Sequence, residues 1–190
     1  MAADGGTLTP KARRTREALI TAAREVIGAE GVGAANVLRV CAVAGVGRTS
    51  FYNYFEGMET LVDAVAEEAA DAVRRRFDEL HAEMPRGMDR LATCIEMILT
   101  SAVDAPQEML LITALATDAP PIRALLEQEI AAELRAAGAG GAAARARLCD
   151  FLATGILALA REFALGRHEA ADVRHYCGYL TAACMQLSKD

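Results

Sequence analysis

The chain has 190 residues, of which 53% are apolar, and it contains only five prolines, so it can bury a substantial core as one large or two small domains. Its formal net charge is −6, and neither a hydrophobic signal core nor a run of 18 apolar residues occurs, which argues against secretion and membrane insertion. We therefore expect a cytoplasmic protein with no membrane partner, in which sparse β-branched and aromatic residues favour helices throughout.

The first fifty residues predict two consecutive helices after a disordered tail over residues 1–10. A helix from about Lys11 to Ala29, closed by Gly31, is indicated by an apolar stripe at Leu19, Ile20, Ala23, Val26 and Ile27. Asn36 is a suitable N-cap for a short helix that reaches Ala44. Gly45 and the sequence AGVG then predict a tight turn before another helix at about Gly47 or Arg48.

The stretch VGRTSFYNYF, residues 46–55, holds four of the nine Phe and Tyr residues of the chain. At about 100° per residue, Phe51 and Phe55 fall on one helix face and anchor it to a core. The opposite face is short and polar, with Thr49, Ser50 and Asn53 at its centre and Tyr52 and Tyr54 beside the Phe pair. Small polar groups suit base edges in a major groove, and tyrosine hydroxyls and arginines suit phosphates. The alternative is a surface helix merely anchored by two phenylalanines.

Charge is unevenly spread along the chain. Residues 1–57 carry seven Lys or Arg against five Asp or Glu, whereas the remainder carries 13 against 21. The positive residues of the first segment gather at Lys11, Arg13, Arg14, Arg16 and Arg48. A basic cluster of this kind is compatible with a nucleic-acid footprint, although a run of this kind is usually just a solvated helix face.

Residues 12–66 resemble the N-terminal DNA-binding domain of TetR-family transcriptional regulators. The resemblance is carried by REALITAAREVIGAEGVGAANVLRVCAVAGVGRTSFYNYFEGMETLVDAV, in the order and spacing of the family. It implies an all-α fold in which a helix-turn-helix domain over residues 11–57 binds double-stranded operator DNA. With the basic cluster, it gives the candidate DNA-binding residues Arg13, Arg14, Asn36, Arg48, Thr49, Ser50, Tyr52, Asn53 and Tyr54.

Three positions depart from the family pattern. Gly47 replaces the usual serine-like N-cap, which removes a side-chain cap while still permitting the turn. Met58 stands where a lysine is usual, so one expected phosphate contact is missing. Arg39 stands where an acidic residue is common and supplies a compensating positive charge. The details of phosphate contact are therefore open.

Periodicity predicts about six further helices, giving about nine in all. The resemblance implies that they form a larger helical domain over residues 58–190 for effector binding and dimerisation. A long helix spans Met58 to Glu83, and others follow from about Met88, from Pro106 to Thr117, and from the APP at 119–121 to about Ala137. The glycine-rich segment 138–141 separates these from two amphipathic helices near 145–164 and 170–187.

In the family, two such final helices usually meet their copies in a second subunit, so the resemblance implies a homodimer. An intramolecular pair without a partner is the alternative. The candidate interface residues come from the apolar stripes: Leu152, Ile156, Leu159, Leu180, Cys184 and Leu187.

The resemblance also implies that an effector lies between the central helices of the larger domain. Residues that are candidates to line such a cavity are equally suited to a plain core. They are Cys94, Met97, Ile98, Met109, Ile112, Phe151 and Tyr176. Their composition favours an unidentified apolar or weakly polar small molecule.

Catalytic and metal-binding signatures are not found in the sequence. The five cysteines form no CxxC pair, so reduced core thiols are expected, with redox sensing or metal binding as the alternatives. His168, Asp172, His175 and Cys177 lack a recognised zinc spacing, and we assign neither metal nor cofactor. No nucleotide-binding glycine loop, HExxH helix or Ser-His-Asp order occurs, so we expect no enzyme. The sequence indicates a ligand-responsive regulator, most often a repressor, or alternatively a helical small-molecule-binding or interaction protein that has lost DNA binding.

Overall fold

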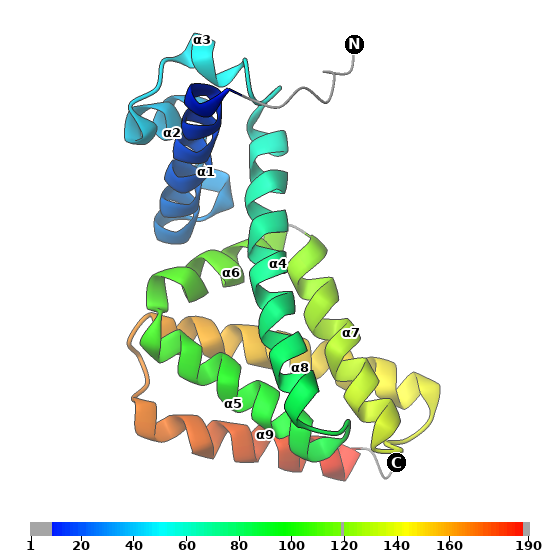
Figure 1. Cartoon of the computed structure of the whole chain (residues 1–190). Helices are drawn as coiled ribbons and strands as arrows, with labels where there is room; N and C mark the ends of the chain where they lie inside the picture. The colour runs from blue at the N-terminus through cyan, green and yellow to red at the C-terminus, as the bar shows by residue number, and fades with distance from the viewer. Residues whose placement is uncertain (1–8, 119, 188–190) are drawn as a thin grey trace. The chain divides into compact units, whose positions relative to one another are not determined.

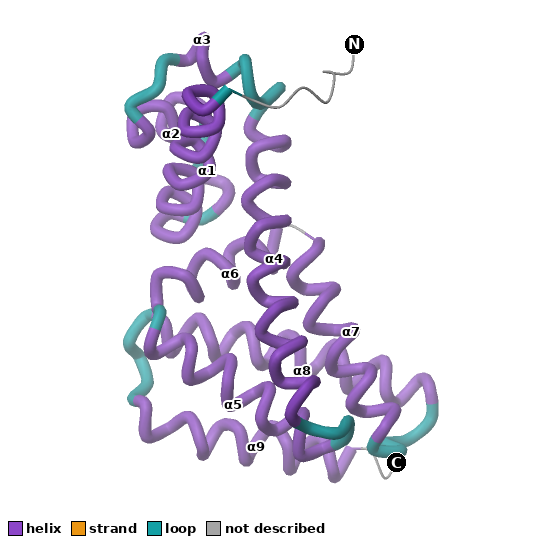
Figure 2. Tube along the Cα trace, in the orientation of Figure 1, coloured by secondary structure: helices purple, strands orange, loops and turns teal. Residues whose placement is uncertain are grey.

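The computed structural model describes residues 9–118 and 120–187, and of Asp118, Pro120 and Leu187 it describes the backbone alone. Over this part of the chain it has nine α-helices, two short 3₁₀ helices and no strand (Figures 1 and 2). The chain divides into two compact units between Val65 and Ala66, within helix α4 (Met58–Glu83). The expected all-α class and its order, a helix-turn-helix domain followed by a larger helical domain, are confirmed.

The helices of the N-terminal unit begin and end at residues with strong local preferences. Helix α1 (Pro10–Glu30) begins where the Thr9 hydroxyl accepts a hydrogen bond from the Ala12 amide at 3.3 Å. It ends at Gly31, whose φ of 87° is strained for any residue with a side chain. A 3₁₀ turn (Val32–Ala34) leads to α2 (Val37–Ala44), which is capped by the Asn36 side chain.

Helix α2 ends at Gly45, in the left-handed conformation with φ 64°, and the chain then turns into the short helix α3 (Arg48–Phe51). The core of this unit joins one face of α1 to α2, α3 and the start of α4. Its buried side chains are Leu19, Ile20, Ala22, Ala23, Val26, Ile27, Val40, Cys41, Phe51, Phe55, Leu61 and Val65. The apolar stripe expected on the first helix is therefore confirmed as its buried face.

The C-terminal unit holds the rest of α4 and five further helices. These are α5 (Met88–Asp104), α6 (Pro106–Asp118), α7 (Pro120–Ala136), α8 (Ala142–Ala164) and α9 (Val173–Leu187), the last preceded by a 3₁₀ turn (Ala170–Asp172). Helix α8 packs against α5, α6, α7 and α9, and α9 also packs against α5. One apolar cluster, in which Leu99, Ile130, Leu152 and Ile156 are almost inaccessible to solvent, fills the space between them.

None of the described helices is by itself long and apolar enough to cross a membrane. The consecutive helices α6 and α7 meet the length and composition requirement only when taken together.

Candidate nucleic-acid interface and effector cavity

The outward surface of α3 is held in place by two buried aromatic rings. Phe51 is fully buried and Phe55 is nearly so, with their ring centroids 5.8 Å apart. The helix is shorter than the expected 46–55 segment because the backbone tightens after Phe51. The amides of Asn53 and Tyr54 donate to carbonyls three residues back, at 3.2 and 2.9 Å, and only the Phe55 amide returns to a carbonyl four residues back. The segment therefore continues as turns after one helical turn.

The polar residues predicted to face DNA do lie on the solvent side of this segment. Arg48, Thr49, Tyr52 and Asn53 are exposed, and Ser50 is half-buried. Tyr54, in the turns between α3 and α4, is also half-buried. The Tyr52 ring stands edge-on to Phe51 at 5.3 Å, which fixes its direction while leaving half of the residue exposed. Donors and acceptors are thus presented on a rigid support.

Two of the basic residues near the start of α1 are solvent-facing cations. Arg13 and Arg14 are exposed, whereas the guanidinium of Arg16 lies 5.4 Å above the Phe55 ring and helps to hold it. The Arg39 guanidinium is paired with Glu30 at 2.6 Å, which raises the pKa of Arg39. The compensating charge expected at Arg39 is therefore already matched by an acidic neighbour.

Asn36, another predicted DNA contact, caps the N-terminus of α2. Its Oδ1 accepts from the Arg39 amide at 3.0 Å, and its Nδ2 donates to the Ala34 carbonyl at 3.3 Å. One N–H of the amide group remains for a further acceptor, such as a phosphate oxygen.

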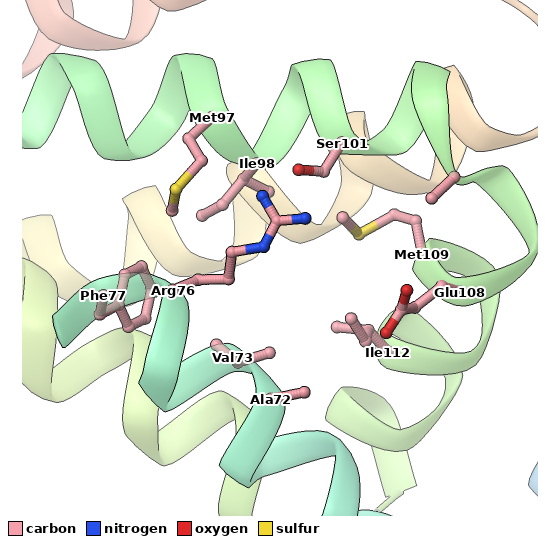
Figure 3. A pocket seen from close by; sticks show the side chains of 11 residues that line it. Ala72, Val73, Arg76, Phe77, Met97, Ile98, Ser101, Glu108, Met109 and Ile112 are labelled. Carbon is pink, nitrogen blue, oxygen red and sulfur yellow. The ribbon is translucent and has the colours of Figure 1, made fainter. Parts of the chain in front are cut away.

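An apolar cavity of about 100 Å³ lies between α4, α5 and α6 in the C-terminal unit (Figure 3). Helix α4 contributes Val73 and Phe77, α5 contributes Met97 and Ile98, and α6 contributes Met109 and Ile112, along with smaller residues. Three polar side chains also border it: Arg76, Ser101 and Glu108. Four of the seven residues predicted to line an effector cavity, Met97, Ile98, Met109 and Ile112, are therefore brought together.

The other three predicted cavity residues lie elsewhere. Cys94 is buried in the core, where burial together with Glu129 and Glu133 raises the pKa of its thiol to about 12. Phe151 is half exposed on α8, and Tyr176 packs edge-on against Phe163 and beside His168. None of these three side chains lines the cavity, since apolar character alone does not tell a cavity wall from a core or a surface.

Sequence reasoning missed the contribution of α4 to the cavity. Val73 and Phe77, an i, i+4 pair with Arg76 between them, lie in the long helix predicted from Met58 to Glu83, to which no cavity role was given. The sequence feature that could have indicated this contribution is a basic residue beside the apolar pair, since its long side chain can reach over the same helix face.

The stripe residues predicted for a dimer interface face the interior of their own chain. Leu152, Ile156, Leu180 and Cys184 are all buried in the core cluster of the C-terminal unit, and Leu159 packs partly against it. Leu187 has its side chain outside the described residues. An amphipathic stripe shows which face is buried and not which chain covers it, so the interface role of these residues stays a prediction. The exposed apolar residues of these two helices are instead Phe151 on α8 and Tyr179 and Met185 on α9.

A buried ionic cluster joins α4, α5 and α7 and was not anticipated. Arg90, only 3% exposed, donates to Glu133, which is completely buried, and also donates to the Met84 carbonyl at 3.1 Å. The second Glu133 oxygen accepts from the Gly87 amide at 2.8 Å. Burial by itself would raise the pKa of the Glu133 carboxyl, but the hydrogen bonds from Arg90 and Gly87 outweigh it, so the pKa is lowered.

The same cluster includes a histidine at its edge. His81 Nε2 lies 2.5 Å from Glu129 Oε1, and ligand atoms of His81, Glu129 and Glu133 lie within 4.8 Å of one another. These donor types suit a metal ion, but the Arg90 guanidinium already supplies the positive charge at Glu133. We therefore treat the cluster as an ion network that ties three helices together.

Comparison with known proteins covers both units. Residues 19–65 match the family described as bacterial regulatory proteins, tetR family. No curated protein matches the chain. Many solved structures do, among them a TetR-like transcriptional regulator from Rhodococcus sp. RHA1, 15% identical, with 94% of this chain and 99% of that one aligned at a TM-score of 0.73.

Two further structures carry more specific descriptions. NalD, the secondary repressor of the MexAB-OprM multidrug efflux pump in Pseudomonas aeruginosa, aligns over 90% of this chain and 96% of its own, with 14% identity and a TM-score of 0.70. A gamma-butyrolactone receptor, described as ArpA-like, aligns over 94% and 99%, with 20% identity and a TM-score of 0.61. At such identities these likenesses show a shared fold.

Proposed function

We propose that this chain, a TetR-family protein by its N-terminal domain, is a ligand-responsive transcriptional repressor that binds a palindromic operator as a homodimer and is released by a small-molecule effector. The carrying observation is the family match over residues 19–65, which coincides with a polar, exposed α3 surface held on two buried phenylalanines. A helix-turn-helix unit with this surface suits the major groove of DNA.

The contacts divide by chemistry. Thr49, Ser50 and Asn53 offer small donors and acceptors to base edges, which carry the sequence information of a major groove. Arg48, Tyr52 and Tyr54 flank them and fix the register on phosphates or nearby base edges. Beyond α3, phosphate contacts come from Arg13, Arg14 and the remaining N–H of the Asn36 amide.

A dimer would place two α3 surfaces about 34 Å apart, one turn of DNA, and so require a palindromic site. The outward faces of α8 and α9 supply the interface. Phe151 is 50% exposed and Tyr179 is 69% exposed, and large aromatic side chains of this kind are enriched in the centres of protein interfaces.

The effector would bind in the cavity between α4, α5 and α6. Among proteins of the same fold, one is described as a receptor for a gamma-butyrolactone and another as a repressor of a drug efflux pump, both in keeping with control by small molecules. A ligand shifts such a protein only by binding one of two conformations more tightly, so the cavity must differ between the DNA-binding and released states.

A second candidate function is a helical small-molecule-binding protein that has lost DNA binding. Two observations favour it: Met58 stands at the start of α4 in place of the usual lysine, and α3 has no side-chain cap at Gly47. The cavity would be retained in this case while the α3 surface would have no nucleic-acid partner.

Gel retardation with DNA from upstream of the protein's own gene separates the two. The proposed regulator shifts one DNA fragment at nanomolar concentration, and its affinity falls steeply between about 50 and 200 mM salt as phosphate contacts release counterions. Uniform weak binding to every fragment, or none at low salt, would reject the regulator and leave the second candidate.

A further inference from the structure

Arg76 is the one basic side chain among the described residues that line the apolar cavity. In Figure 3 its guanidinium extends from α4 toward α5, beside Ile98 and Ser101 and across from Met109. Apart from Ser101, the α5 side of this wall is aliphatic or thioether. Arg76 itself is exposed to solvent, so its guanidinium keeps its hydration while its side chain borders this apolar wall.

Among the described residues, two other side chains of α4 have partners of opposite type, and Arg76 does not. Arg74 binds Asp71, and His81 contacts Glu129, but Arg76 has no ion pair or hydrogen bond to another described residue. Its guanidinium therefore keeps five N–H donors in a planar fork, a geometry that matches the two oxygens of a carboxylate.

Arg76 also marks the mouth of the cavity. Together with Met97, Ser101 and Ala105 it borders a second, more open hollow of about 380 Å³, whose other lining residues are polar or acidic: Thr93, Glu96, Thr100 and Asp104. The inner cavity is lined mainly by apolar side chains, whereas the outer hollow is lined mainly by polar ones and opens to solvent. A molecule whose apolar body fills the inner space would hold its polar end at Arg76.

We propose that the effector is a small amphipathic carboxylate, whose apolar body occupies the inner cavity and whose carboxylate accepts hydrogen bonds from Arg76, with the Ser101 hydroxyl as a second donor. The role of this molecule as an effector rests on the proposed function. Its binding in the cavity does not. This assignment replaces the apolar or weakly polar molecule that the sequence indicates.

Three carboxylates near the cavity are the features that would favour a cation instead. Glu96 and Asp104 line only the outer hollow, where water and salt screen them. Glu108 lines the inner cavity on α6, away from the α5 side toward which Arg76 points (Figure 3). Direct bidentate contact with Arg76 outweighs these more remote charges.

Calorimetric titration of the full chain without DNA tests the assignment with three probes of one size: benzoate, benzyl alcohol and benzylamine. Cavities on the order of 150 Å³ hold a benzene ring, and this cavity opens outward. Benzoate should bind at least about tenfold more tightly than the alcohol, with no binding of the amine. Arg76→Gln should weaken benzoate about 10- to 100-fold and leave the alcohol unchanged.

Arg75→Gln is the matched control, since Arg75 is exposed on the same helix and outside both linings, and it should leave all affinities unchanged. Equal binding of benzoate and the alcohol, no benzoate binding at millimolar concentration, or a benzoate preference that survives Arg76→Gln would overturn the proposal. Tighter binding of benzylamine, abolished by Glu108→Gln, would establish a cationic ligand instead. Because binding is measured without DNA, failure to shift an operator would count against the regulator alone.

Discussion

Replacing Arg90 by methionine isolates the contribution of the buried ionic cluster. The substitution keeps most of the side-chain volume but removes the guanidinium from Glu133, whose side chain is completely buried. Gly87 still donates one hydrogen bond to the carboxylate. The carboxylate would then remain buried with only the half-exposed Arg86 guanidinium, 3.9 Å away, as a counter-charge, which is a costly state for such a group.

The expected loss is about 3–5 kcal/mol in the free energy of unfolding, the cost of leaving one partner of a buried ion pair alone. For a chain of this size the melting temperature falls by about 2–4 °C per kcal/mol, so a decrease of about 6–20 °C follows. The double variant Arg90→Met, Glu133→Leu removes both charges and should recover most of that loss, because a packed apolar pair often replaces a buried ion pair at little cost.

The effect should also depend on pH with a definite sign. In the native protein the pKa of Glu133 is lowered from 4.5, so its stabilising contribution is complete above that value and is lost as the pH falls through the lowered pKa. Without Arg90, burial is no longer outweighed and the pKa of Glu133 rises above 4.5. The variant should therefore be less destabilised at pH 4 than at pH 7.

Thermal unfolding followed by circular dichroism at pH 7 and pH 4 measures both quantities. A single Arg90→Met variant that loses less than about 1 kcal/mol at pH 7 would show that Glu133 is not held as a buried carboxylate. An unchanged deficit at pH 4 would show that its ionisation is not the cause.

Three further outcomes are expected. Phe51→Ala should cost about 3–5 kcal/mol of stability in the N-terminal unit, as for a fully buried ring. Asn53→Ala should leave the melting curve unchanged and weaken binding at one operator position by about 1–3 kcal/mol in gel retardation. Equal effects of both variants on stability would contradict the outward placement of Asn53. Tyr179→Glu should convert the dimer to a monomer in sedimentation at micromolar concentration, while Arg75→Glu should leave the dimer intact. A Tyr179→Glu protein that stays dimeric would exclude the outward face of α9 from the interface. Iodoacetamide at pH 7 should label none of the five buried cysteines in the native chain and all of them in denaturant, because burial raises the pKa of each thiol; rapid native labelling would mean that the helices around them open.

The boundaries of most helices could be predicted because they depend on residues a few positions apart. Asn36 accepts a hydrogen bond from an amide three residues on, and Gly31 and Gly45 adopt positive φ at helix ends. Such preferences act before any tertiary contact forms. The short extent of α3 was not predictable in this way, because periodicity places Phe51 and Phe55 on one face whether the backbone between them is helical or turned.

The ionic cluster and the charged side of the cavity depend on residues far apart in the chain. Arg90 and Glu133 are 43 positions apart, and His81 and Glu129 are 48 apart. Taken alone, each of these residues resembles an ordinary charged residue on the polar face of an amphipathic helix, since surface helices carry many charged residues. Only the packing of α4, α5 and α7 shows that two of these charges are buried together.

The final two helices show why a stripe alone cannot identify an interface. Burial of Leu152, Ile156, Leu180 and Cys184 against their own chain satisfies the whole amphipathic pattern, so hydrophobic periodicity would be the same in a monomer. The remaining signal is a large aromatic residue exposed on the polar side of the stripe, a residue type enriched at protein interfaces. Tyr179, more than two-thirds exposed in a single chain, is such a residue. In the proposed dimer a partner chain would cover this side chain, and the surface that sequence reasoning passed over is the one on which that dimer depends.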